Sequence, residues 1–152
     1  MSEPSGGPVT EDQVRQLLSA YQQYQAEADA LVRQLSLAQM TEQGLGRAVT
    51  AVEALSSAQV DQEILVPIGS GSYAYAKLAS TDRIILNVGG GVSLDKPVDQ
   101  ALETLKKRRA EIGEGVRKLG EAVSKVEGEM AQIQSVIEQL EHAAAGSEGV
   151  VQ

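Results

Sequence analysis

The sequence has no cysteine, no phenylalanine and no tryptophan, and its single histidine is His142, near the C-terminal end. Without cysteine there can be no disulfide framework and no thiolate chemistry, which fits a reducing compartment, so we expect a cytoplasmic protein. One terminal histidine leaves no set of nitrogen and sulfur ligands for a metal, and no base for histidine-dependent catalysis. The sequence therefore predicts neither a metal site nor an enzyme.

Aromatic residues amount to only 3% of the chain, although a compact core of 152 residues normally uses large rings. This scarcity favours a thin core made of aliphatic seams. The formal net charge of −8 repels phosphate groups, so we expect neither nucleic-acid binding nor attachment to an anionic membrane. No apolar run approaches the roughly 18 residues of a membrane span, and residues 1–9 lack the apolar region of a signal peptide.

Two long stretches carry apolar side chains at alternating spacings of three and four residues. The first comprises Val14, Leu17, Tyr21, Tyr24, Ala28, Leu31, Leu35, Ala38, Leu45, Val49 and Val52, and the second comprises Val98, Leu102, Leu105, Ile112, Val116, Leu119, Val123, Val126, Met130, Ile133, Ile137 and Leu140. A mean spacing of 3.5 residues is typical of a left-handed coiled coil. We therefore predict a mainly α fold in which two long helices pair as an antiparallel hairpin.

The two stripes also predict a register for this pairing. If Val14 faces Leu140, every later seam position of the first helix meets a seam position of the second, apart from two polar residues, Glu42 and Arg109, in adjacent layers. One hypothesis is that these two side chains form an ion pair that fixes the register. The alternative is that each side chain reaches out of the seam to solvent.

A β-rich segment at 63–96 separates the two stripes. Turn sequences at 69–71, 80–82 and 89–91 divide it into four short strands, which predict two β-hairpins. The first glycine turn superficially matches a dinucleotide-binding fingerprint, but a strand follows it where that fingerprint requires a helix, and we expect no cofactor. A sheet this small has open edges and buries little surface, so it should need other subunits to pair with.

The predicted organisation is a single folded domain between two disordered tails. The tails are expected at 1–9 and 146–152. The domain at 10–145 contains a helix at 10–57, the hairpins at 63–96 and a helix at 97–145, with Pro97 as the first residue of that second helix.

Two further surfaces have open interpretations. The basic run at 106–109 is either a solvated face that pairs with Glu53 or Glu103, or a docking patch for a partner. At the far ends of the helices the apolar stripe widens, and this surface either binds a partner or broadens the intramolecular seam. The residues outside the strict seam are Leu18, Val32, Leu37 and Val136.

The β segment is similar to that of one known family. The run from Val66 to Tyr73 resembles the first hairpin, and the runs from Arg83 to Val92 and from Leu94 to Lys96 resemble the second hairpin, of the archaeal prefoldin α subunit. The presence of two hairpins is typical of the α class. The resemblance covers nearly the whole chain, from about residue 10 to 145.

This resemblance implies an ATP-independent chaperone in which two α and four β subunits assemble through their hairpins into a β-barrel body. The coiled-coil tips would bind unfolded polypeptides and deliver them to a group II chaperonin. Carried over to this chain, subunit assembly falls to Val66, Ile68, Tyr73, Tyr75, Ile84, Leu86, Val88 and Val92. Binding of unfolded polypeptide falls to Val14, Leu17, Leu18, Ile133, Val136, Ile137 and Leu140. The rival hypothesis is a structural coiled-coil adaptor that assembles a complex without binding unfolded chains.

Overall fold

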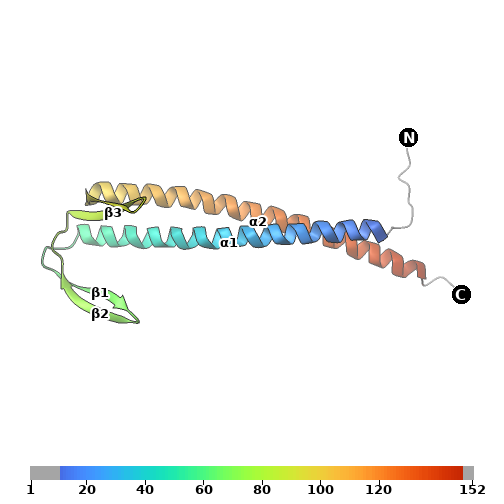
Figure 1. The fold of residues 1–152 in the computed structure, drawn as a ribbon, viewed down its shortest axis with the longest axis horizontal. Coiled ribbons are helices and arrows are strands. Elements are labelled where there is room, and N and C mark those ends of the chain that lie inside the picture. Colours follow the sequence, from blue (N-terminus) through green and yellow to red (C-terminus); the bar gives the residue numbers. More distant parts are fainter. Residues whose placement is uncertain (1–10, 149–152) are drawn as a thin grey trace. The chain divides into compact units, whose positions relative to one another are not determined.

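The computed structural model describes residues 11–148 and contains two long helices with two β-hairpins between them (Figure 1). In chain order the elements are α1 (Glu11–Ser56), β1 (Glu63–Gly69), β2 (Ser72–Lys77), β3 (Arg83–Gly89), β4 (Val92–Pro97) and α2 (Val98–Glu148). The predicted helices and the two predicted hairpins are therefore confirmed. The tails expected at 1–9 and, for the most part, at 146–152 lie outside the described residues.

The chain divides into two compact units. The helical unit comprises residues 11–37 of α1 and 116–148 of α2. The hairpin unit comprises residues 38–115, with the remaining parts of both helices and all four strands. Within each unit, a segment of α1 lies beside a segment of α2 (Figure 1).

Both ends of α2 differ from the prediction. Pro97 is the last residue of β4, paired with Arg83, and α2 begins at Val98. The amide of Val98 donates to the carbonyl of Asp82 at 2.9 Å, so the chain is still bonded to the neighbouring segment at this point, and proline is tolerated at the end of such a strand. At the other end α2 continues to Glu148, past the expected limit at 145.

The core is a narrow seam, as the scarcity of aromatic residues predicts. All but one of the buried helix residues occupy predicted seam positions: Ala28, Val49, Val52, Val98, Leu105, Val123 and Val126. The exception is Ala101, which is fully buried although it lies outside the predicted stripe. In the hairpin unit, four of these seam residues and Leu86 of β3 form one buried cluster.

The two hairpins are built on the same plan. In both, a seven-residue strand pairs with a six-residue strand, and one extra residue, Ile68 or Val88, forms a bulge just before the turn. Each turn has two central residues with positive φ, Ser70 (48°) with Gly71 (74°) in one and Gly90 (62°) with Gly91 (76°) in the other. Such turns match the right-handed twist of paired strands.

Candidate functional sites: the hairpins and the helix ends

The described residues contain no group of three or more potential metal ligands from histidine, cysteine, aspartate and glutamate. Within residues 11–148, no helix is long and apolar enough to cross a membrane. Exposed apolar side chains occur on the hairpins and along both helices.

Glu42 and Arg109 do not form the hypothesised ion pair, since no nitrogen–oxygen contact within 4.0 Å joins them among the described residues. Each side chain instead lies over a glycine of the opposite helix. The Glu42 carboxylate oxygen lies 3.2 Å from where a Cβ would stand on Gly113, and the Arg109 guanidinium carbon lies 3.3 Å from the corresponding point on Gly46. Because neither glycine has a side chain, Glu42 and Arg109 have space to extend out of the seam.

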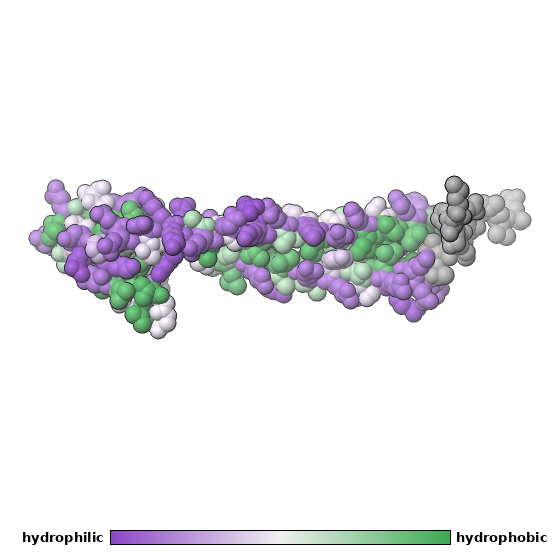
Figure 2. Space-filling model, turned by 90° about the horizontal axis from the view of Figure 1, so that it is seen from above, coloured by the Kyte–Doolittle hydropathy of each residue, from purple (hydrophilic) through white to green (hydrophobic). Residues whose placement is uncertain are grey.

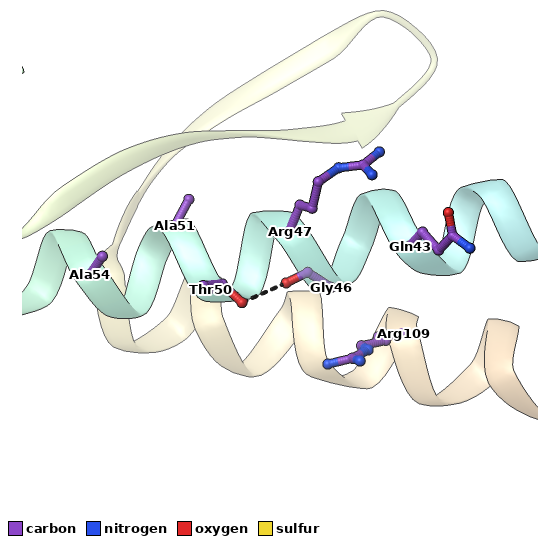
Figure 3. Close-up of a pocket in the computed structure, with 7 residues that line it drawn as sticks. All are labelled: Gln43, Gly46, Arg47, Thr50, Ala51, Ala54 and Arg109. Carbon is purple, nitrogen blue, oxygen red and sulfur yellow. Dashed lines mark hydrogen bonds between the residues drawn. The ribbon is translucent and has the colours of Figure 1, made fainter. Parts of the chain in front are cut away.

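These reciprocal contacts agree with the predicted register, because Glu42 lies beside Gly113 as Arg109 lies beside Gly46. Figure 3 shows the Arg109 side chain of α2 next to α1, and six α1 residues complete the lining of an open groove there. The Thr50 hydroxyl donates to the carbonyl of Gly46 at 3.1 Å, so this polar group of the groove is already satisfied within the helix. We assign the groove no ligand.

The β3–β4 hairpin packs against the helices of its own chain. Leu86 retains only 6% of its surface exposed, inside the cluster with Val49, Val52, Val98 and Leu105, and Ile84 packs against the same cluster. A hydrogen bond reinforces this packing: Nη1 of Arg108 on α2 donates to the carbonyl oxygen of Asn87 at 2.8 Å. The outward face keeps Ile85 76% exposed.

The β1–β2 hairpin contributes no residue to that buried cluster. Its apolar side chains are exposed on both faces: Leu65, Val66, Ile68, Tyr73 and Tyr75. The ladder is complete within the hairpin, and at its open end the amides of Asp61 and Leu78 donate to the carbonyls of Leu78 and Gln62. What stays unused in this hairpin is therefore apolar surface and the outer edges of the two strands.

The predicted assembly residues thus fall into two groups. Six are exposed: Val66, Ile68, Tyr73, Tyr75, Val88 and Val92. Leu86 and Ile84 instead belong to the intramolecular packing, so their side chains are occupied within the chain. Sequence reasoning missed three exposed apolar residues, Leu65, Ile85 and Leu94. Leu65 and Ile85 lie on the strand faces opposite to Val66 and Leu86, and Leu94 pairs with Leu86 across the second hairpin. The alternation along each strand could therefore have identified all three.

The predicted polypeptide-binding residues also divide. Val14, Leu17, Ile133, Ile137 and Leu140 are half-buried in the helical unit, as seam residues should be. Leu18 and Val136 are 47% and 41% exposed. Val32 and Leu37, which also lie outside the strict seam, are exposed as well. Figure 2 shows the resulting apolar surface, in green, along the helical unit between purple polar side chains.

Three of the four residues in the basic run on α2 make different contacts within the hairpin unit. Lys106 forms an ion pair with Glu53 of α1 at 3.3 Å, which confirms one of the predicted pairings. Arg108 binds the hairpin turn region, and Arg109 covers Gly46. Most of this run is therefore used inside the hairpin unit.

Two groups with shifted pKa values lie at the start of the second hairpin: Asp82, in the loop that joins the hairpins, and Arg83, the first residue of β3. The Ser80 hydroxyl donates to Oδ1 of Asp82 at 2.5 Å and holds the pKa of Asp82 below its usual value. The hydrogen bond and ion pair from Nε of Arg83 to Oδ1 of Asp95, at 3.0 Å, raise the pKa of Arg83, which stays charged. Both side chains are exposed at the base of the second hairpin, where they line an open hollow together with Pro97 and Val98.

Comparisons with known proteins agree on one group. A sequence model described as "Prefoldin subunit" matches residues 21–143. A prefoldin subunit alpha of Methanothrix thermoacetophila is 59% identical over 116 residues, which is 76% of each chain. A prefoldin subunit alpha of Methanococcoides burtonii is 31% identical over 129 residues, covering 85% of this chain and 94% of that protein.

Among solved structures, a chain of filamentous PFD from Methanocaldococcus jannaschii superposes with a TM-score of 0.63. The match covers 80% of this chain and 98% of that one at 20% sequence identity, so it supports the fold alone. It confirms that two long helices joined through β-hairpins are the arrangement of a known structure.

Proposed function

From the premise that this chain belongs to the prefoldin family of chaperone subunits, in its archaeal α class, we propose that it is a subunit of an ATP-independent holdase. In this role it assembles through its hairpins and binds unfolded polypeptides at the ends of the helical unit. The observation that carries the proposal is the placement of exposed apolar side chains in those two regions.

The assembly surface proposed is the exposed part of the two hairpins. Tyr73 and Tyr75 expose large rings that a monomer gains nothing by displaying, and the β1–β2 hairpin has strand edges open to further pairing. We propose that two copies of this chain join four prefoldin β subunits there, and that their strands complete a β-barrel. The Leu86 side chain takes no part in this contact, because it is buried within the chain.

The client surface proposed lies where α1 begins and α2 approaches its end. Leu18 and Val136 supply exposed apolar contacts, and the half-buried residues Val14, Leu17, Ile133, Ile137 and Leu140 become available if the two helices part there. An unfolded segment binds such a surface by burying apolar area of its own. The complex would then pass the segment to a group II chaperonin in the cytoplasm.

The test separates assembly from holding. One double variant, Leu18→Ser with Val136→Ser, changes the helix ends. The other, Tyr73→Ser with Tyr75→Ser, changes the β1–β2 hairpin. Each is mixed with a prefoldin β subunit, its mass is measured by light scattering, and its suppression of the aggregation of a denatured protein is followed. We expect the first variant to assemble normally and to hold poorly, and the second to fail in assembly.

A structural adaptor is the second candidate function, supported by the fact that most exposed apolar side chains belong to the hairpins. If the wild-type complex assembles but never suppresses aggregation, the adaptor function replaces the holdase. If the chain stays a monomer or a simple dimer in the presence of the β subunit, the assembly proposal is wrong as well.

A further inference from the structure

The ends of the helical unit combine exposed apolar side chains with uncompensated negative charge. We infer that this surface selects unfolded segments that carry net positive charge next to their apolar residues. The inference rests on the proposed holdase function and names the class of client that this chain's own ends would favour.

The charge at the end of α2 is one-sided. Residues 126–146 contain four carboxylates, Glu127, Glu129, Glu138 and Glu141, and no lysine or arginine. None of these four forms an ion pair among the described residues, and only Glu138 accepts a side-chain hydrogen bond, from the neutral Gln134 at 3.4 Å.

The start of α1 adds charge of the same sign. Residues 11–32 contain four carboxylates and a single arginine, Arg15, which lies 3.8 Å from Asp12. Three carboxylates on this segment therefore have no partner of opposite charge among the described residues: Glu11, Glu27 and Asp29. Exposed Leu18 and Val136 thus lie on helix segments whose charge is almost entirely negative.

Helix stability accounts for Glu11 and Asp12, which lie in the first turn of α1, but not for the acidic residues near the end of α2. The C-terminal end of a helix carries a partial negative charge, so basic residues stabilise it and acidic residues oppose it. This effect is confined to the last turn, which contains no basic residue in α2, and Glu138 and Glu141 lie before that turn, so the dipole gives no reason for their charge. Away from these ends several carboxylates have basic partners: Glu121 pairs with Arg117, Glu53 with Lys106 and Asp95 with Arg83.

The physical consequence is selection by charge on top of apolar binding. Exposed charges act over a Debye length of about 8–10 Å at moderate salt, which is the scale of one bound client segment. A cationic segment is attracted to the surface during encounter and retained beside the carboxylates, whereas an anionic segment with the same apolar residues is repelled. The preference must weaken as salt is added.

The experiment uses the assembled complex and measures peptide binding at the end of this chain's helical unit only. A photo-crosslinking amino acid replaces the exposed Gln139 of α2, so that only contacts of this chain are recorded. Three unfolded peptides share the same apolar residues and differ at four positions, which are all lysine, all glutamine or all glutamate. Affinities come from crosslinking yield against peptide concentration, at about 50 mM and about 500 mM salt.

We expect the lysine peptide to bind about five-fold or more tightly than the glutamine peptide at low salt, and less than about two-fold more tightly at high salt. The double variant Glu138→Gln with Glu141→Gln should reduce this preference and leave the affinity for the glutamine peptide unchanged. The matched control, Glu103→Gln with Glu111→Gln, removes the same charge from exposed positions of α2 in the hairpin unit and should preserve the preference.

Equal affinity for the three peptides would overturn the inference while the holdase function stands, because all three would still bind. A preference for the lysine peptide that survives the Glu138 and Glu141 changes would also overturn the inference. If that variant in addition transferred clients poorly to a chaperonin, the carboxylates would serve docking to the chaperonin and not client selection. Failure of every peptide to crosslink would instead contradict the proposed holdase function itself.

Discussion

The two hairpins have the same strand lengths, the same bulge and the same type of turn, yet one is packed and the other is exposed. Leu86 on β3 is 6% exposed, whereas Val66, at the equivalent position of β1, is 38% exposed. A backbone plan therefore does not decide where a hairpin goes. The size of the side chain and its contacts with the helices decide it. Here the β3–β4 hairpin packs against the helices, and the β1–β2 hairpin stays exposed.

The difference has two visible sources. Leucine fills the space between the seam valines of the two helices, and burying a side chain of that size contributes about 1.5–3 kcal/mol. Arg108 then satisfies the carbonyl of Asn87, while among the described residues the equivalent carbonyl of Pro67 has no such bond from a helix. The packed hairpin thus belongs to the fold, and the exposed hairpin is the one left for partners.

The largest expected effect comes from truncating the buried anchor. Leu86→Ala should lower the free energy of unfolding by about 2–4 kcal/mol, because it removes buried methyl groups and leaves a cavity in the cluster. Val66→Ala, the matched change on the exposed hairpin, should cost less than about 0.5 kcal/mol. Urea unfolding of the purified chain measures both. Equal losses would show that the two hairpins are packed alike.

A smaller effect should follow from removing the hydrogen bond between α2 and β3. Arg108→Met keeps much of the side-chain length but cannot donate to Asn87, so we expect a loss of about 1 kcal/mol. Amide hydrogen exchange should quicken in β3 and β4 and stay unchanged in β1 and β2. Lys107→Met removes a neighbouring charge and serves as the control; if it has the same effect, charge and not the hydrogen bond is responsible.

An effect of similar size concerns the turns. Gly71 and Gly91 have nearly equal positive φ values, 74° and 76°, and a methyl group at either one meets no atom within 4 Å, so alanine adds only backbone strain, about 1 kcal/mol. Gly91→Ala should lower the stability of the whole chain by about that amount, because its hairpin is part of the core. Gly71→Ala should loosen β1–β2 locally and leave the unfolding midpoint nearly unchanged. A shift of equal size in both variants would contradict this distinction.

Much of the fold could be predicted because it depends on periodic patterns. A spacing of 3.5 residues predicted both helices and nearly all of their buried positions. Glycine-containing turns between alternating residues predicted both hairpins. Ala101 escaped the pattern because a methyl group carries little hydrophobic signal, although its place between Val98 and Leu105 makes it the most buried residue of the seam. Pro97 was misplaced by one residue because a proline suits both a strand end and a helix start.

Sequence alone determined the element types, the helix pairing, its register around Glu42 and Arg109, and the charge of the helix ends, because each depends on residues counted along one chain. Only the tertiary structure decided which hairpin packs, and that Glu42 and Arg109 lie over Gly113 and Gly46 with no ion pair between them. Those outcomes depend on the space available between segments distant in sequence. A glycine opposite a long side chain leaves space for that side chain to reach solvent. There its charge keeps most of its hydration, so a buried ion pair is not needed to stabilise it.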